Sequence, residues 1–333
     1  MKIGIAGIAF HLPEDVLDNA ALARQQPRFQ PDKVKAKTGI DRRHIAAAGE
    51  TAGDLAVRAA RKLFAEQAVD PVTIDYVILC TQAPDYFLPS TSCLVHRQLG
   101  LKPEAGALDI NLGCSGFVYG LGLAQGLIET GQAGRVLLLT ADTYSKFIAL
   151  DDLSTRTIFG DGAAATLIEA RADGALGPFV YGTDGSGAQH LIVPTGGLRD
   201  RCGSGPGYTT HSGEQGPGAP LHMNGPEVFN FTIAAVPRAI EQLLAKAGLG
   251  AEAVDLFVFH QANATMLEAL RRKLDIPPSR FYVNLEGGNT VSSTIPIAMH
   301  RAAAQGVLRP GMRVLLLGFG VGYSWAGTLL RWG

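Results

Sequence analysis

The chain has 333 residues, of which 47% are hydrophobic and 18% are charged, and its 41 glycines and 18 prolines are spread along its length. This composition is typical of a globular protein with a large core, it excludes disordered and fibrous classes, and the length favours two fused halves. Lys and Arg number 29 against 30 Asp and Glu, and no block of like charge could follow a phosphate backbone, so we expect no nucleic-acid partner.

The N-terminal run MKIGIAGIAFHLPEDV is apolar only as far as Pro13 and Glu14. It is too short to span a bilayer and lacks a signal-type cleavage site, so we expect a first strand, no membrane association and a cytoplasmic protein. The cysteines are scattered: Cys80, Cys93, Cys114 and Cys202. Without a C-x-x-C pair they predict free thiols, with neither a disulfide framework nor a metal site.

Strand-like runs alternate with helical stretches in both halves. In the first half, strands are predicted at 3–9, 76–81, 107–111 and 136–140 and a helix at 51–67. In the second half, helices are predicted at 228–246 and 263–274 and strands at 256–260 and 314–317. This alternation predicts an α/β fold.

The halves also repeat one another in order. IDYVILCTQA, LDINLGCSG and RVLLLTADTYS correspond to VDLFVFHQA, YVNLEGGN and RVLLLGFGVGYS. We infer a duplication, with halves 1–172 and 173–333 packed into one unit and a Gly- and Pro-rich excursion at 183–220. Related halves should bring Cys114, His260 and Asn289, each in a loop after a strand-like run, to a shared centre where α/β folds place ligands.

Three side chains in these loops could carry chemistry. Cys114 begins a helix that is apolar or small on nearly every face, and a helix N-terminus should lower the pKa of the thiol and favour the thiolate nucleophile. A nucleophilic thiol needs a nearby basic or hydrogen-bonding group, which His260 could be. Asn289 beside a neutral imidazole could hold a thioester carbonyl as it becomes an enolate. The ordinary alternatives are a small buried Cys, a core His and a helix-capping Asn.

Two other motifs are weaker. GFGVGYSWAG from Gly318 lacks the βαβ unit of a dinucleotide site, but the backbone N–H of Val321 and that of Cys114 could together hold a tetrahedral oxyanion. The GCSG run is one residue short of a serine nucleophile elbow.

The motifs GCSGFVYGL, FGDGAAATLI, HQAN, GGNT and GFGVGYSWAGTLLR together resemble the β-ketoacyl-acyl-carrier-protein synthase III family. The resemblance covers essentially the whole chain and implies a thiolase-like duplicated fold, layered α-β-α-β-α with buried central helices. It implies that Cys114 takes an acyl group from coenzyme A or a carrier. His260 and Asn289 would then stabilise the enolate formed when a malonyl thioester loses carbon dioxide, and the acyl group would be condensed with it.

The same resemblance implies substrate contacts, and the chain departs from some of them. Gly225, Phe229, Ala262 and Asn263 match positions that contact pantetheine. Where the family has a stacking Trp and two Arg residues for coenzyme A, this chain has Lys33, Lys37 and Leu153. Lys37 remains a candidate contact. These changes favour weaker binding of free coenzyme A or delivery of the acyl group on a carrier protein.

An acyl-pocket gate is the last implied feature. Relatives often close this pocket across a dimer with a Phe that stands before the residues PS. In the segment YFLPS this chain has Leu88 at that position, so we expect a longer or branched primer. The exception would be that the adjacent Phe87 closes the pocket instead. The implied partners are an acyl carrier protein, coenzyme A thioesters and a second copy in a homodimer, with no tightly bound cofactor. The alternatives are an acyltransferase that uses a hydroxyl or amine acceptor, and a non-catalytic partner subunit of a ketosynthase.

Overall fold

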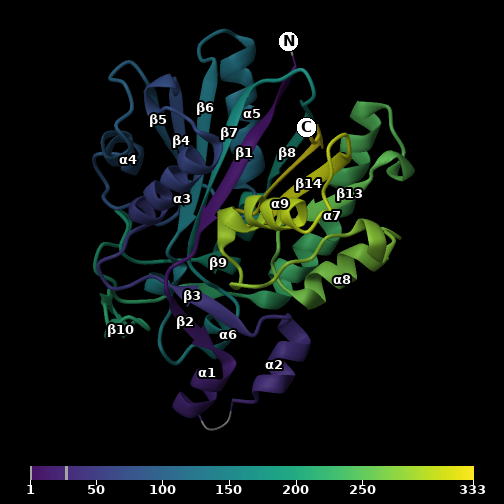
Figure 1. The fold of residues 1–333 in the computed structure, drawn as a ribbon. Coiled ribbons are helices and arrows are strands. Elements are labelled where there is room, and N and C mark those ends of the chain that lie inside the picture. Colours follow the sequence, from purple (N-terminus) through teal and green to yellow (C-terminus); the bar gives the residue numbers. More distant parts are fainter. Residues whose placement is uncertain (1, 27–28) are drawn as a thin grey trace.

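The computed structural model describes residues 2–26 and 29–333, and two β-sheets run through its centre (Figure 1). The order of the first sheet is β1 (Ile3–His11), β7 (Gly162–Ala170), β6 (Arg135–Asp142), β4 (Tyr76–Cys80) and β5 (Gly106–Ile110). The order of the second is β13 (Leu256–Phe259), β14 (Arg313–Gly320), β15 (Ser324–Arg331) and β8 (Ala175–Thr183). The predicted α/β class is confirmed.

The second sheet repeats the pairing of the first. Strands β4 and β6 are parallel, β7 is antiparallel to β6, and β1 is antiparallel to β7. In the same way β13 and β14 are parallel, β15 is antiparallel to β14, and β8 is antiparallel to β15. This repetition confirms the duplicated fold. The boundary at 172 and 173 stays a prediction and falls between β7 and β8.

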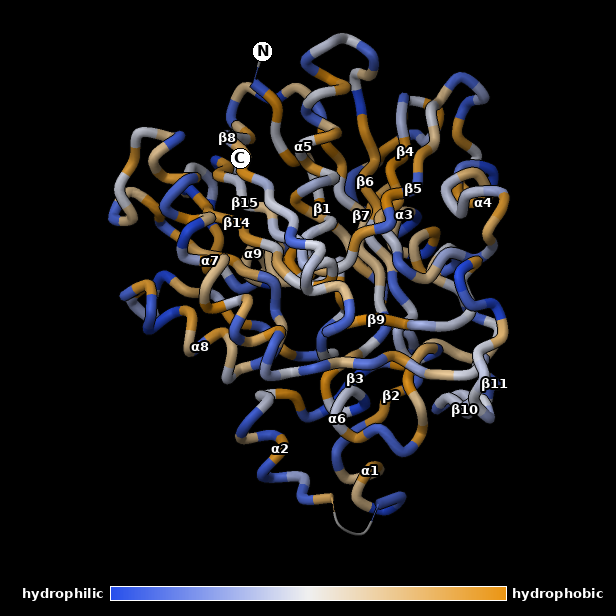
Figure 2. The backbone as a smooth tube through the Cα atoms, turned by 180° about the vertical axis from the view of Figure 1, so that it is seen from behind, coloured by the Kyte–Doolittle hydropathy of each residue, from blue (hydrophilic) through white to orange (hydrophobic). Residues whose placement is uncertain are grey.

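Helices cover both sheets and fill the space between them. On the first sheet, α3 (Ala52–Gln67) packs against β1, β7 and β6, and α4 (Thr91–Leu99) lies against β5. Between the sheets lie α5 (Gly116–Glu129) and α9 (Thr294–Ala304), and on the far side α7 (Gly225–Ala247) covers the second sheet with α8 (Ala264–Lys273) against it. The hydropathy colouring concentrates apolar residues along the central strands (Figure 2). The predicted layering with buried central helices is therefore confirmed.

Local signals explain where several elements begin and end. Thr51 and Asp54 form a capping box, so α3 begins at Ala52, next to the predicted bound. Helix α7 begins at Gly225, before the predicted residue 228, because Asn224 caps it and Pro226 occupies its first turn.

The strand expected just before Asn289 is wrong. Within this segment Phe281 and Gly287 form only isolated bridges, with Phe257 and Arg43, and the N–H of Asn284 donates to the side chain of Gln261 instead of to a neighbouring strand. Gly287 and Gly288 then turn the chain at positive φ, which ends any extended run.

Short elements lie outside the two sheets. At the bottom of Figure 1 lie β2 (Asp15–Asp18), α1 (Asn19–Gln25), α2 (Pro31–Thr38), β3 (Arg42–Ile45) and α6 (Leu153–Arg156). The excursion and the residues after it form β9 (Leu191–Ile192), β10 (Tyr208–Thr209), β11 (Gln215–Gly216) and β12 (His222–Met223). Leu191 and Leu221 pack in one buried cluster with Cys114, so this excursion covers the centre of the molecule.

Candidate active site

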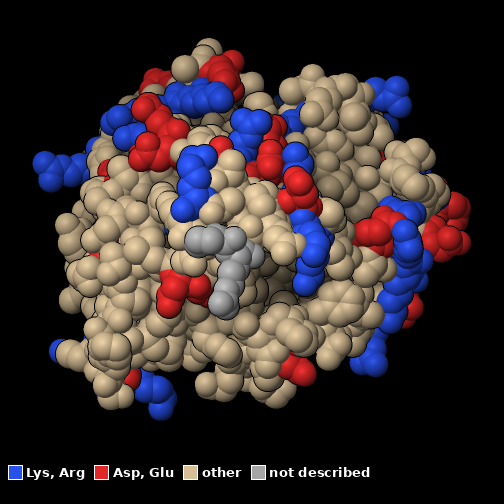
Figure 3. Space-filling view, turned by 90° about the horizontal axis from the view of Figure 1, so that it is seen from below, with Lys and Arg blue, Asp and Glu red and all other residues tan. Residues whose placement is uncertain are grey.

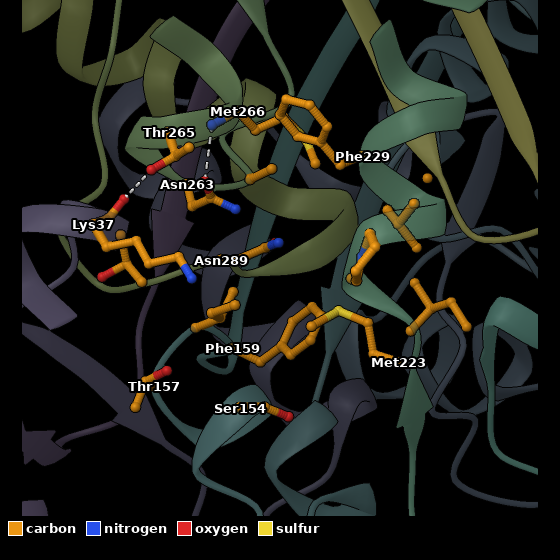
Figure 4. Close-up of a pocket in the computed structure, with 18 of the residues that line it drawn as sticks. Lys37, Ser154, Thr157, Phe159, Met223, Phe229, Asn263, Thr265, Met266 and Asn289 are labelled. Atoms are coloured by element: carbon orange, nitrogen blue, oxygen red, sulfur yellow. Dashed lines mark hydrogen bonds between the residues drawn. The ribbon is translucent and has the colours of Figure 1, made fainter. Parts of the chain in front are cut away.

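A cavity of about 810 Å³ leads from the surface at α2 to the buried centre of the molecule (Figure 4). Its outer end is lined by the exposed Lys37, and its inner end by Cys114, His260 and Asn289, which are 6%, 2% and 4% exposed. The rest of the lining is mostly apolar: Phe29, Val34, Leu153, Ile158, Phe159, Leu191, Met223, Val228, Phe229, Met266 and Phe319. The structure therefore brings the three predicted reactive side chains to one place.

Cys114 sits in a tight turn after β5. The N–H of Gly116 donates to the carbonyl of Gly113 at 2.8 Å, and α5 begins only at Gly116 with Ser115 as its N-cap. The thiol faces the end of β14, where a Cβ atom placed on Gly320 would lie 2.9 Å from Sγ. Cys114 therefore precedes the helix instead of opening it.

The lowered pKa expected for Cys114 is wrong for this structure. Burial raises the pKa of the thiol to about 12, and the negative charge of Asp142 raises it further. Helix α5 begins two residues after Cys114, and the effect expected from its N-terminus does not outweigh burial. The thiol is therefore protonated at neutral pH.

Two backbone N–H groups act on the sulfur in the opposite direction. Hydrogen bonds from the N–H groups of Cys114 and Val321 lower the pKa of the thiol, although by less than burial raises it. Val321 follows β14, so these two donors come from different halves of the fold. Both act on the sulfur, so they lie near the place where an oxyanion would form during attack on a thioester.

His260 follows β13, and its backbone N–H donates to the carbonyl of Leu317 at 2.8 Å. The Nδ1 atom lies 2.7 Å from the hydroxyl of Thr294, and the ring meets Phe319 edge-on, with 5.5 Å between centroids. Complete burial lowers the pKa of His260 to about 3. The imidazole is therefore neutral at physiological pH.

Asn289 is held by its backbone and by its side chain. Its N–H donates to the carbonyl of Ile158 at 2.9 Å, and its Oδ1 accepts from the N–H of Val291 at 2.9 Å. Because the oxygen is engaged there, the Nδ2 donor is left to face His260, 3.5 Å from Nε2. The alternative of a helix cap is not observed, since Ser293 occupies that position of α9.

A buried carboxylate lies next to this centre, and sequence reasoning missed it. Asp142 ends β6, where it accepts from the N–H of Gln82 at 2.8 Å and from the hydroxyl of Ser292. Complete burial raises the pKa of Asp142 to about 7. An acidic residue at the end of an apolar strand is a signal that could have identified it.

The residues predicted to contact pantetheine line the same cavity, and they comprise Lys37, Gly225, Phe229, Ala262 and Asn263. Asn263 also caps α8 through a bond from the N–H of Met266 at 2.9 Å, which occupies its side-chain oxygen. Leu153 lines the cavity and Lys33 does not. Met223 and Met266 are lining residues that sequence reasoning missed, because no local pattern marks them.

The predicted acyl-pocket gate lies elsewhere on the chain. Phe87 and Leu88 are 72% and 86% exposed, and neither lines the cavity of its own chain. They belong to a loop between β4 and α4. A gating role would therefore have to be exerted on another copy.

In the part of the chain that the structure describes, neither a metal-binding cluster nor a membrane-spanning helix is present. Within residues 2–26 and 29–333, no group of three or more His, Cys, Asp or Glu could hold a metal ion. None of the helices described there combines the length and apolar character that crossing a membrane requires.

Family models match two parts of the chain. Residues 108–185 match the model described as 3-oxoacyl-[acyl-carrier-protein (ACP)] synthase III, and residues 244–332 match the model of its C-terminal part. The first match includes Cys114 and the second includes His260 and Asn289.

Known proteins resemble the chain over its full length. A β-ketoacyl-[acyl-carrier-protein] synthase III of Nitratidesulfovibrio vulgaris is 38% identical over 98% of each chain. A crystal structure of a 3-oxoacyl-(acyl-carrier-protein) synthase III is 54% identical, with a TM-score of 0.95 and 100% of each chain covered. The corresponding protein of Pseudomonas aeruginosa PAO1 is 33% identical, with a TM-score of 0.88, over 100% of this chain and 98% of its own.

Proposed function

The chain belongs to the β-ketoacyl-acyl-carrier-protein synthase III family, and we propose that Cys114, His260 and Asn289 perform its two half-reactions. It is an acyltransferase that condenses an acyl primer with a malonyl-carrier thioester in fatty acid biosynthesis. The observation that carries the division of labour is the single cavity whose buried end is lined by all three side chains.

Cys114 accepts the primer in the first half-reaction. Its sulfur attacks the thioester carbonyl, the carbon–sulfur bond to the carrier breaks, and the departing thiolate takes the proton that the Cys114 thiol gives up. The high pKa of Cys114 requires that this proton leave as the attack proceeds. The backbone N–H groups of Cys114 and Val321 would stabilise the tetrahedral oxyanion.

His260 and Asn289 act in the second half-reaction. When the malonyl thioester loses carbon dioxide, the electron pair of the broken carbon–carbon bond moves into an enolate. The enolate oxygen would accept hydrogen bonds from His260 Nε2 and Asn289 Nδ2. The enolate carbon then attacks the acyl group, the Cys114 carbon–sulfur bond breaks, and the thiolate that leaves takes a proton from solvent.

The charge of the cavity favours primers that are delivered on a carrier protein. Among the described lining residues, Lys37 is the one that carries a charge, and Leu153 stands where an Arg was expected. Positive and negative side chains are interspersed on the face at the α1 and α2 end (Figure 3). Pantetheine is common to both donors, and the contacts proposed for it are Lys37 at the mouth and Gly225, Phe229, Ala262 and Asn263 along the wall.

A second copy of the chain would complete the assembly. Strand β5 forms an edge of the first sheet, and its Leu108 is 41% exposed. The nearby loop presents Tyr86, Phe87 and Leu88 with 61%, 72% and 86% of their surfaces exposed. Unpaired strand edges and exposed apolar patches favour protein contacts. We therefore infer a homodimer in which Phe87 or Leu88 contributes to the partner's acyl pocket.

Intact-mass measurement of the acyl adduct tests the division of labour. Cys114→Ala should abolish loading from acyl-carrier and acyl-coenzyme A donors, whereas His260→Ala and Asn289→Ala should load but lose roughly 100-fold or more in malonyl decarboxylation. Cys93→Ala, which removes an exposed thiol, is the control. Loading that survives in Cys114→Ala would refute the proposal, and faster loading from coenzyme A than from the carrier would refute the donor preference.

A further inference from the structure

Thr294 is a buried residue behind His260. It begins α9, it is 3% exposed, and it is not among the residues that line the cavity. Its hydroxyl nevertheless lies 2.7 Å from Nδ1 of His260. Thr294 therefore touches the side of the imidazole opposite the nitrogen that faces Asn289.

The proposed chemistry requires one particular tautomer of His260. A neutral imidazole carries a single N–H, and an enolate oxygen can be stabilised only by a nitrogen that donates. The proton must then be on Nε2, which leaves Nδ1 with a lone pair that needs a donor. Complete burial keeps the ring neutral, because it lowers the pKa of His260 to about 3.

The Thr294 hydroxyl can be that donor. Its oxygen has two potential acceptors, Nδ1 of His260 at 2.7 Å and the carbonyl of Val291 at 3.2 Å. The shorter distance is to the imidazole. We propose that Thr294 is a positioning residue that donates to Nδ1 and thereby keeps the His260 proton on Nε2, and this inference rests on the proposed role of His260.

The spacing between His260 and Asn289 supports the same tautomer. Asn289 Nδ2 is a donor, because its Oδ1 is occupied by the N–H of Val291. It lies 3.5 Å from Nε2, outside the 2.7–3.2 Å range typical of N–H hydrogen bonds. Two donors at this separation do not bond to each other, but both can reach a single oxygen placed between them.

Rotation of the same hydroxyl would abolish this arrangement. If the hydroxyl donated to the Val291 carbonyl, Nδ1 would have to carry the proton and donate to Thr294. Nε2 would then be a bare acceptor and could not stabilise an enolate. The side chain at 294 thus controls the second half-reaction without touching substrate.

The tautomer can be observed directly in the full-length protein. With ¹⁵N-labelled histidine, the His260 signals are identified by their loss in His260→Ala, and the wild type should show the proton on Nε2 and a bare Nδ1. In Thr294→Val the preference should weaken, and kcat for malonyl decarboxylation should fall roughly 10- to 100-fold with little change in KM. Acyl loading of Cys114 should be retained.

Two variants separate positioning from folding. Thr294→Ser keeps the hydroxyl and should restore most of the decarboxylation. Thr166→Val, at a buried hydroxyl without a partner among the described residues, should leave activity unchanged. A wild-type His260 protonated on Nδ1, or full decarboxylation by Thr294→Val, would overturn the inference. Normal decarboxylation by His260→Ala would instead refute the proposed function on which it rests.

Discussion

Strands β6 and β14 occupy equivalent places in the two halves, yet they end differently on either side of Cys114. β6 ends at Asp142, whose negative charge contributes to the raised pKa of the thiol. β14 ends at Gly320, where a Cβ atom would lie 2.9 Å from the sulfur. Duplication thus supplies a common scaffold, and the residue at the end of each strand determines what that half can do.

The same contrast holds for β4 and β13. After β4, the N–H of Gln82 donates to Asp142, so this half holds one buried acid near Cys114. After β13 stands His260, which is neutral and hydrogen-bonded to Thr294. In the proposed mechanism the first half holds the acyl group and the second supplies neutral donors for decarboxylation, so the two half-reactions should be separable by mutation.

The largest effect on acyl loading should come from adding a side chain at Gly320, the last residue of β14. In Gly320→Ala, the added methyl group would lie 2.9 Å from both Cβ and Sγ of Cys114, so the strand or the turn that holds the thiol would have to shift. Overpacking of this kind costs about 1–3 kcal/mol, and the same free energy added to the barrier for attack by the displaced sulfur corresponds to roughly 5- to 150-fold in rate. Acyl loading measured by intact mass should slow by that factor.

The matched control adds a methyl group where there is space. Gly126 lies in α5, and a Cβ atom there would meet nothing within 4 Å. Gly126→Ala should load at the wild-type rate. If Gly320→Ala also loaded at the wild-type rate, acyl loading would not depend on the space that Gly320 leaves beside the Cys114 sulfur.

The next effect concerns the acid at the end of β6. The pKa of Asp142 is about 7 in the folded protein against an ordinary value of 3.8, so between these values the folded state binds more protons than the unfolded state. The free energy of unfolding contributed by this group therefore falls as pH rises through that window. Relative to Asp142→Asn, the wild type should lose on the order of 2 kcal/mol between pH 5 and pH 8.

Urea unfolding at the two pH values measures this change. The constant cost of the substitution, which includes the altered contact with Ser292, cancels because only the pH dependence is compared. Glu104→Gln, at an exposed position, is the control and should follow the wild type at both values. If the free energy of unfolding changed equally between pH 5 and pH 8 in the wild type and in Asp142→Asn, the pKa of Asp142 would not be raised in the folded protein.

Features that depend on residues close together in the sequence could be predicted, and features that depend on contacts between distant residues could not. Repeated segments and hydrophobic periodicity are local, so the duplicated fold and the positions of Cys114 and His260 after strands were accessible, whereas the strand expected before Asn289 is absent. The raised pKa of Cys114 was not, because it depends on burial and on Asp142, which only tertiary packing brings close. The contact of Thr294 with His260 depends on a turn in which Val291 adopts φ +55°. No sequence pattern predicts this turn.

A further contrast between the halves concerns the loops that follow β4 and β13. After β13 the chain enters α8 at once, and Ala262 and Asn263 line the cavity. After β4 a longer loop runs to α4, and its Leu88 is 86% exposed. This loop is therefore available to a second copy of the chain, and its effect on primer choice should depend on the dimer.

The smallest effect should come from Leu88→Phe, because Leu88 lies outside the cavity of its own chain. If the loop closes the partner's acyl pocket, the larger ring should shift the preference toward shorter primers. The change in relative loading rate should stay below the roughly 10- to 200-fold that a hydrophobic pocket achieves for one methylene. Intact-mass competition between short and long acyl donors measures the shift. Leu198→Phe, at another exposed leucine (74%), is the control and should leave the profile unchanged. An unchanged profile in Leu88→Phe, in a protein that sedimentation shows to be dimeric, would remove this loop from the acyl site and leave primer choice to the cavity of a single chain.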